Sequence, residues 1–183
     1  MRLLSLLSKF FFAFLWGLRM KELFLVRHAK SSWPSATESD FDRPLNGRGK
    51  KDAPIMGKHL KISREVVLGQ VICSPAKRAR ATAKRLLEGL DYPFEQVVWK
   101  EVIYSGNDTD LLKLVQGTDD GHPSLMVIGH NPYITDLVCL LANESIDDMP
   151  TCGVFAVTFD VTTWSSVSSG LGKKRFFDVP KLI

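Results

Sequence analysis

Two histidines and two arginines stand at or just beyond the ends of three short apolar runs in this sequence. They are Arg27, His28, Arg78 and His130. A planar guanidinium grips two oxygens of a phosphoryl group at once, which a lysine ammonium cannot do. A neutral imidazole is a competent nucleophile near physiological pH. Together, the four side chains would suit attack by a histidine on phosphorus.

In such a reaction His28 would attack phosphorus in line, and a covalent phosphohistidine would form on its ring. The other three side chains would hold the non-bridging oxygens and stabilise the charge of the transition state. Water would then hydrolyse the phosphoenzyme. No metal and no cofactor are expected, because the arginines supply the positive charge that Mg²⁺ supplies elsewhere. The three cysteines also lack the close spacing of a zinc site.

Neighbouring strands of one sheet must bring these residues together. The apolar runs 23–26, 71–73 and 125–128 predict strands, the first of them buried on both faces. In open parallel sheets, ligands bind beyond the carboxyl ends of the strands. Two of the three strand ends also lead into helices, whose N-termini favour an anion. The three strand ends therefore predict one phosphate-binding crevice.

Helical stretches separate the apolar runs, which predicts an α/β domain, a three-layer α/β/α sandwich with a mainly parallel sheet. Asn46 is expected to cap a helix that runs to about Leu60, in which Pro54 should cause a kink or delay the start. Ser74-Pro75 and Asn131-Pro132 are each expected to open a helix, the first over 76–90 and the second over 133–142. Further expected elements are a helix over 108–116 capped by Asn107 and strands over 96–99, 154–159 and 175–179.

Residues 1–19 form a nearly continuous apolar segment, interrupted by Lys9. The segment is too short and too broken to predict a membrane span, and it lacks a small-x-small cleavage site. Three interpretations stay open: a membrane-leaning amphipathic helix, a weak targeting sequence, or residues upstream of a true start at Met20. The last is favoured because Met20 leads directly into a strand. We therefore expect one domain over 20–183, with membrane contact only if residues 1–19 are retained.

The composition fits one soluble globular domain, with 45% hydrophobic and 24% charged residues among 183. A net charge of +4 suits an anionic partner but is too small to indicate nucleic acid. The basic helix after Ser74 has no interleaved aromatic residues for base stacking, so its outer charges are expected to be a solvated face. An odd number of cysteines indicates reduced thiols. We expect a cytoplasmic protein, with organellar targeting or membrane association by residues 1–19 left open.

Four motifs resemble those of the histidine phosphatase superfamily, which has the phosphoglycerate-mutase-like fold. They are LVRHAKSSW at 25–33, DRPLNGRG at 42–49, CSPAKRARAT at 73–82 and VIGHNP at 127–132. The resemblance extends from Met20 to the C-terminus and is closest to the SixA-like phosphohistidine phosphatases. Ala29 stands where many members of the superfamily have glycine, although alanine is typical of that branch. The resemblance implies that Arg27, His28, Arg78 and His130 are catalytic, and that Arg43 and Asn131 bind substrate in the same pocket.

The general acid is the open point of this predicted site. Glu101 is the best candidate for a proton donor by its order along the chain, although it could instead orient other groups. A phosphate ester leaves as a poor alkoxide and needs a strong acid, whereas phosphohistidine has a weaker P–N bond and needs less. With no inserted cap domain in so short a chain, phosphohistidine on a protein is the favoured substrate. A phosphomonoesterase for a small metabolite or phosphoserine, and a non-catalytic phosphate-binding module, are the alternatives.

Overall fold

Strand β1 (Lys21–Arg27) lies inside a six-stranded sheet with the order β3-β2-β4-β1-β5-β6. It pairs in parallel with β4 (Ser124–Gly129) and antiparallel with β5 (Val154–Phe159). Strand β2 (Gln70–Cys73) also runs parallel to β4, as does β3 (Val98–Trp99) to β2. Of the six strands, only β5 runs in the opposite direction; it lies between β1 and the edge strand β6 (Lys173–Asp178) and pairs antiparallel with both. The predicted mainly parallel sheet is confirmed.

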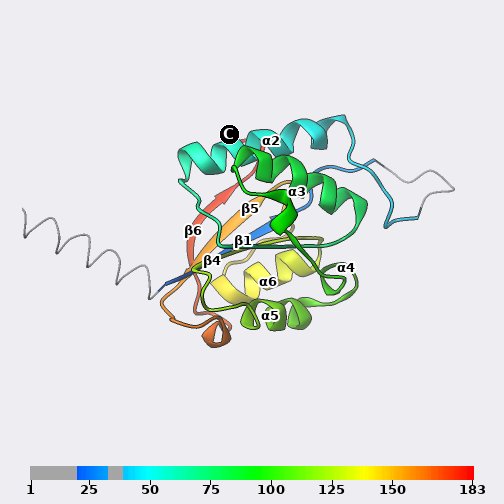
Figure 1. The fold of residues 1–183 in the computed structure, drawn as a ribbon. Coiled ribbons are helices and arrows are strands. Elements are labelled where there is room, and N and C mark those ends of the chain that lie inside the picture. Colours follow the sequence, from blue (N-terminus) through cyan, green and yellow to red (C-terminus); the bar gives the residue numbers. More distant parts are fainter. Residues whose placement is uncertain (1–19, 33–38) are drawn as a thin grey trace, which may run out of the picture.

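The computed structural model describes residues 20–32 and 39–183 (Figure 1). The extension predicted over residues 1–19 lies outside the described residues. Within the described part, no helix is long and apolar enough to cross a membrane. The other elements are α2 (Gly47–Ser63), α3 (Lys77–Gly89), α4 (Val102–Ser105), α5 (Asp108–Gln116), α6 (Tyr133–Ala142) and the short 3-10 helices η1 (Phe94–Gln96) and η2 (Trp164–Ser166).

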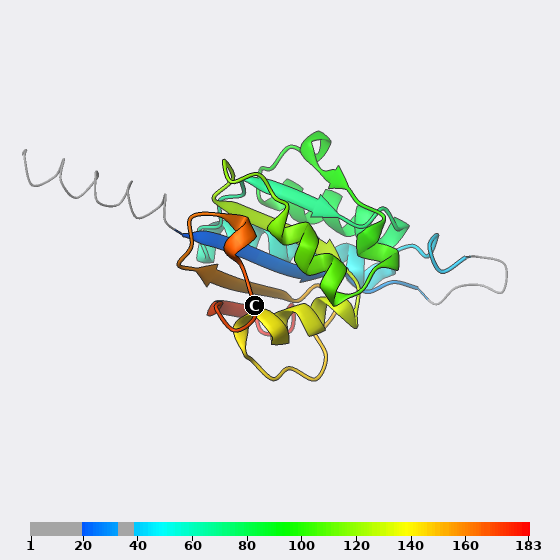
Figure 2. The same cartoon turned by 90° about the horizontal axis from the view of Figure 1, so that it is seen from below.

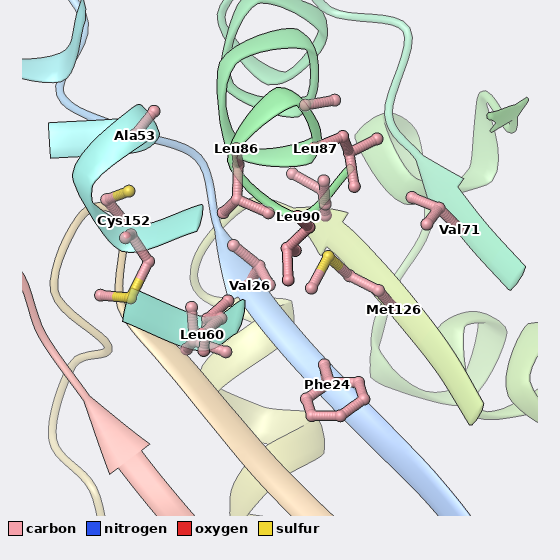
Figure 3. Close-up of a cluster of buried hydrophobic side chains, with 14 of the residues drawn as sticks. Phe24, Val26, Ala53, Leu60, Val71, Leu86, Leu87, Leu90, Met126 and Cys152 are labelled. Atoms are coloured by element: carbon pink, nitrogen blue, oxygen red, sulfur yellow. The ribbon is translucent and has the colours of Figure 1, made fainter. Parts of the chain in front are cut away.

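Helices cover both faces of the sheet, so the predicted three-layer sandwich is also confirmed. Helices α2 and α3 lie on one face and α5 and α6 on the other (Figures 1 and 2). Side chains of β1 alternate between the two layers, with Phe24 and Val26 under α2 and α3, and Leu23 and Leu25 toward α5 and α6. Figure 3 shows the hydrophobic core between the sheet and helices α2 and α3, in which side chains of these helices pack over those of the strands. Each fully buried side chain of this size stabilises the fold by about 1.5–3 kcal/mol.

Two glycines allow α2 and α3 to cross closely. A Cβ atom on Gly57 would lie 2.1 Å from the carbonyl oxygen of Leu86, and one on Gly89 would lie 2.7 Å from the amide nitrogen of Lys58. Both neighbours are backbone atoms, which cannot rotate away. The absence of these two methyl groups therefore sets the distance between the two helices.

Two predicted helix caps are wrong, although helix α6 begins at Tyr133 as predicted and α3 at Lys77, one residue after the predicted start. No side chain caps α3, and Ser74 lies outside its first turn. The Ser74 hydroxyl accepts a hydrogen bond from the Ala76 N–H (3.3 Å) and also contacts a histidine of the next strand end. Because these bonds hold Ser74 in the turn before the helix, its hydroxyl does not cap α3. Asn131 does not cap α6 either, since its side-chain amide bonds elsewhere.

The other predicted caps are confirmed. The Asn46 side chain accepts a hydrogen bond from the Gly49 N–H (2.9 Å), and Asn107 forms a capping box with Asp110. Pro54 does not delay the helix that follows Asn46. Helix α2 begins at Gly47 and continues through the proline to Ser63.

Substitution Gly57→Ala should lower the free energy of unfolding by about 1–3 kcal/mol, because the new methyl group forces α2 away from α3. The matched control is Gly47→Ala on the same helix, where nothing lies within 4 Å of the added Cβ. Alanine in an exposed helical position should instead be neutral or stabilising by up to about 1 kcal/mol. Urea denaturation of both variants checks the prediction, and equal stabilisation by both substitutions would contradict it.

Candidate active site

Three adjacent strands end at the same level and position the site. Strand β4 lies between β1 and β2, with Arg27 opposite Gly129 and Cys73 opposite Ile128. The ladder continues past the strand ends, since the His28 N–H donates to the Gly129 carbonyl and the Ser74 N–H to the Ile128 carbonyl, both at 3.0 Å. The residues that follow the three strands therefore meet at one edge of the sheet. They are His28, Ser74 and His130.

The tautomer of His28 follows from its two hydrogen bonds. Its Nδ1 lies 2.8 Å from the Ala29 carbonyl oxygen, which can only accept, so Nδ1 carries the proton. Its Nε2 lies 3.2 Å from Nε of Arg78, which can only donate, so Nε2 holds a lone pair. Both neighbours require the same neutral tautomer. The nitrogen that points toward the arginine is the one able to attack an electrophile.

Burial keeps the His28 ring neutral. The residue is 9% exposed. Burial above all, together with the positive charges of Arg78, Arg27 and Arg43, lowers the pKa of His28 from 6.5 to about 4 against the opposing effect of the Ala29 carbonyl. At neutral pH this imidazole is therefore uncharged and has its lone pair on Nε2.

Arg78 connects His28 to a carboxylate that the sequence did not single out. The guanidinium is buried in the first turn of α3 and donates to the side chain of Asp40 (2.9 Å) as well as to the Asp40 carbonyl. Asp40 also accepts from Arg43 (2.8 Å) and from the hydroxyl of Tyr104 (3.1 Å). The hydrogen bond from Arg43, together with Arg78, lowers the pKa of Asp40 to about 2. Asp40 is thus a carboxylate at any physiological pH.

Arg43 makes further hydrogen bonds besides the one to Asp40. Its Nε donates to the Ser32 carbonyl (3.0 Å) and its second terminal nitrogen to the Ser31 hydroxyl (2.9 Å). These bonds hold the guanidinium against the loop that follows His28. Arg43 and Arg78 therefore face the same Asp40 carboxylate from two different segments.

His130 lies beside His28, with ring centroids 5.0 Å apart. Its Nε2 is 2.8 Å from the hydroxyl of Ser74, and the ring of Tyr104 packs edge-on at 5.5 Å. Burial, and next the neighbouring His28 and Arg78, lower the pKa of His130 to about 3. The site therefore holds two neutral imidazoles surrounded by arginines.

Arg27 and Asn131 share a second carboxylate, Asp148. A terminal nitrogen of Arg27 donates to Asp148 (2.8 Å) and to the Met149 carbonyl (2.6 Å), and the Asn131 amide donates to the same two residues. Nε of Arg27, Nδ1 of His130 and Oδ1 of Asn131 are buried without a hydrogen-bond partner among the described residues. An unmet buried donor costs about 1–3 kcal/mol, so the Arg27 Nε–H could contribute to holding an anion.

Glu101 is not joined to this cluster. It is exposed at the start of the short helix α4, and within the described residues no hydrogen bond or ion pair reaches its carboxylate. Tyr104, in the same helix, is the residue that bonds to Asp40. Across residues 20–32 and 39–183, no group of three or more histidines, cysteines and carboxylates is arranged to hold a metal ion.

Sequence analysis missed Asp40, Tyr104 and Asp148. Asp40 lies in a polar loop three residues before Arg43, and this short spacing was the one indication in the sequence that the two side chains could pair. Asp148 is 121 residues from its partner Arg27, and nothing in its local sequence marks it. The ring of Tyr104 contacts the site only because α4 follows β3 at the same sheet edge.

Comparisons with known proteins agree with this geometry. The family described as the histidine phosphatase superfamily (branch 1) matches residues 23–101. An uncharacterised protein of Mycobacterium tuberculosis is 31% identical over 166 residues, which cover 85% of this chain and all of that protein. The likeness therefore covers most of this chain and the whole of that protein, well beyond the four motifs.

Solved structures give the same result. A structure of the protein histidine phosphatase SixA complexed with tungstate has a TM-score of 0.75 and 26% identity, and covers 88% of this chain and 98% of that one. A SixA-type protein from Agrobacterium tumefaciens, described as a putative phosphohistidine phosphatase, also has a TM-score of 0.75, at 23% identity over 87% of this chain and 98% of that one, which shows the shared fold. The chain therefore belongs to the histidine phosphatase superfamily, and within it resembles the SixA-like branch.

Proposed function

We propose that this phosphatase removes phosphate from phosphohistidine on a protein, through a covalent phosphohistidine on His28. The observation that carries the proposal is the locked neutral tautomer of His28. Nδ1 carries the proton, and the lone pair on Nε2 faces the guanidinium of Arg78. A bound phosphoryl group held by that guanidinium would lie next to the attacking nitrogen.

In the first step the Nε2 lone pair of His28 forms a bond to phosphorus, while the bond from phosphorus to the leaving nitrogen breaks. The Arg78 Nε–H must move from Nε2 to a phosphoryl oxygen, because one lone pair cannot accept that bond and attack together. The phosphorylated ring gains positive charge, and the Ala29 carbonyl stabilises it through the Nδ1–H. Arg43 and Arg27 balance the charge on the oxygens.

In the second step a water oxygen bonds to phosphorus, and the bond from phosphorus to Nε2 breaks. The electron pair returns to Nε2, one proton of the water passes to solvent, and inorganic phosphate leaves. No group of the protein changes its net protonation over the cycle. The proposed reaction runs without a metal ion.

The carboxylates around the site favour a leaving group that needs little protonation. Asp40 and Asp148 both accept hydrogen bonds from arginines, and the arginines hold the pKa of Asp40 near 2, so Asp40 cannot donate a proton at neutral pH. An imidazole whose second ring nitrogen carries a proton leaves as a neutral molecule, whereas an alkoxide needs an acid. Phosphohistidine therefore suits this site better than a phosphate ester. Glu101 as the proton donor and Asn131 as a substrate ligand stay predictions.

Trapping the phosphoenzyme tests the nucleophile. Wild-type protein given a ³²P-labelled phosphohistidine peptide, with a strong chelator present, should acquire label that is stable to base and labile to acid. His28→Ala should acquire none and lose turnover by at least about 10³-fold, since the covalent step is gone. His122→Ala is the control, because in the described structure the hydrogen bonds of His122 all come from its backbone and none from its ring.

A substrate panel then separates the alternatives. Phosphohistidine peptide should be preferred over phosphoserine peptide and sugar phosphates. A clear preference for either ester would replace the assigned substrate with that of a phosphomonoesterase. Phosphopeptide affinity without any turnover, unchanged in His28→Ala, would instead mean a phosphate-binding module.

The lowered pKa of His28 predicts a pH profile. An ordinary histidine would be about 90% protonated at pH 5.5, one unit below its usual pKa. The ring of His28 should stay neutral there and protonate only near pH 4, which NMR of the imidazole resonances measures. Below pH 6.5 the unfolded chain binds protons that the folded site refuses, so the free energy of unfolding should fall as the pH falls from 6.5 toward 4. A His28 resonance that titrates near pH 6.5 would rule out the neutral, buried nucleophile.

Asp40 competes with a phosphoryl group for the two arginines that it bonds. Asp40→Asn removes that charge and should tighten the binding of tungstate by about three- to ten-fold, as expected for two partly exposed ion pairs of up to about 1 kcal/mol each. Isothermal titration calorimetry measures the change. Asp42→Asn is the control, because it makes the same change in charge two residues away, at a carboxylate that accepts a hydrogen bond from the Ser39 hydroxyl. Weaker tungstate binding by Asp40→Asn would mean that the carboxylate aligns the arginines instead of competing with the ligand.

A further inference from the structure

A groove of about 660 Å³ runs along the outer side of α3, next to the candidate active site. Its apolar lining comes from Phe41, Pro75 and Phe94, each of them half-buried. Its basic lining comes from α3. From the sequence, the basic residues on the outer side of this helix were expected to form only a solvated face. Hereafter we call this hollow the α3 groove.

The α3 groove begins where the site ends. The Lys77 N–H donates to the Phe41 carbonyl at 3.0 Å, and Lys77 directly precedes Arg78. The ring of Phe41 packs edge-on against Tyr104 at 5.1 Å, and Tyr104 bonds to Asp40. A segment of a substrate that leaves the site past Phe41 would therefore enter the groove.

The charge of the α3 groove is unbalanced. Four cations line it, Lys77, Arg80, Lys84 and Arg85, against two carboxylates, Asp42 and Glu88. The first three cations follow one another at intervals of three and four residues, so they lie along one side of the helix. In the part of the chain that the structure describes, no ion pair joins any of the four to a carboxylate, whereas Lys61, Lys174 and Arg175 elsewhere are paired.

An aromatic pair fixes the position of Arg80. Its guanidinium stacks over the ring of Trp99 with 4.3 Å to the centroid, and Trp99 packs edge-on against Phe94 at 5.6 Å. A stacked guanidinium keeps its hydrogen-bond donors free at its edge and loses less entropy when it binds a carboxylate. The same stacking occupies a face of Trp99, which disfavours a nucleic acid that would need that face for its bases.

The length of the α3 groove suits a peptide. From Lys77 to Glu88 the helix rises by about 16 Å, at 1.5 Å per residue. An extended chain covers that distance with about five residues. A small phosphorylated metabolite would fill the site and leave the groove unused.

We propose that the α3 groove binds an acidic segment of about five residues beside the phosphorylated residue of a protein substrate. This inference rests on the proposed function, and it adds the kind of protein on which the enzyme acts. Carboxylates of that segment pair with Arg80, Lys84 and Arg85, while an apolar side chain contacts Phe41 and Pro75. The groove selects the substrate, and the strand-end residues carry out the reaction.

The proposal is tested with two phosphohistidine peptides. They differ only in five flanking residues, which are acidic in one peptide and neutral in the other. Phosphoimidazole serves as a substrate with no flank. Wild-type protein should show a KM about ten-fold lower for the acidic peptide at low salt, and the preference should fall at high salt. Arg80→Glu with Lys84→Glu should abolish the preference and leave phosphoimidazole turnover within about two-fold, since neither residue touches the site. Lys84→Glu alone repeats the test without disturbing the Arg80–Trp99 stack.

The matched control is Lys50→Glu with Lys51→Glu, which makes the same change in net charge on the exposed side of α2, outside the groove. It should keep the preference. Equal KM values for the two peptides in wild-type protein, or equal loss of the preference in the control, would overturn the proposal. So would a single-stranded oligonucleotide that displaces the acidic peptide at lower concentration than the peptide itself.

Fluorescence anisotropy of a labelled, unphosphorylated acidic peptide separates this proposal from the reaction. Binding that Lys84→Glu weakens would support the groove even if no phosphohistidine substrate were hydrolysed. Failure to hydrolyse phosphoimidazole would count against the proposed function alone. Hydrolysis of phosphoimidazole with no binding of the acidic peptide would count against the groove alone.

Discussion

The register of β4 between β1 and β2 is the constraint on which the site depends. One strand pairs in parallel with both neighbours, so three carboxyl ends are set at one level by backbone hydrogen bonds. His28 and Ser74 extend that ladder by one residue each through their own amides. A shift of one residue in either pairing would reverse the side on which every following side chain lies. The distance between the two histidine rings is therefore a property of the sheet.

Burial and the positive charge of the arginines both lower the pKa of the two histidines, whereas at Asp40 they act in opposite directions and the charge prevails. Both effects favour a neutral imidazole at His28 and His130, and the charge favours an ionised carboxylate at Asp40. A site of this kind is poor at general acid catalysis and well suited to nucleophilic attack by nitrogen. The reactivity of the two histidines is therefore set by their burial and by the arginines around them. The proposed substrate, phosphohistidine, is consistent with these surroundings because its leaving group needs little protonation.

Much of the fold and part of the site could be predicted from the sequence, because those features depend on short segments. The centre of β1, residues 23–26, is apolar since both of its faces are buried, and such a run is visible without a structure. The histidines were found because they follow such runs. Asp148 could not be found, since its role comes from a loop 121 residues away from Arg27. The cap of α3 was predicted wrongly because the Ser74 hydroxyl bonds to His130 at another strand end, and that competition is absent from the local sequence.

Helix α3 directs Arg78 inward from its first turn and its other basic side chains outward from later turns. Its crossing with α2 has no room for a methyl group at Gly57, so the helix cannot slide to change that arrangement. An insertion of one residue after Arg78 would turn every later side chain by about 100° around the helix axis. Natural variation in length should therefore be tolerated before Lys77 or after Gly89, and excluded between them. The length of helix α3 thus fixes the spacing between the buried Arg78 and the basic side chains of the groove.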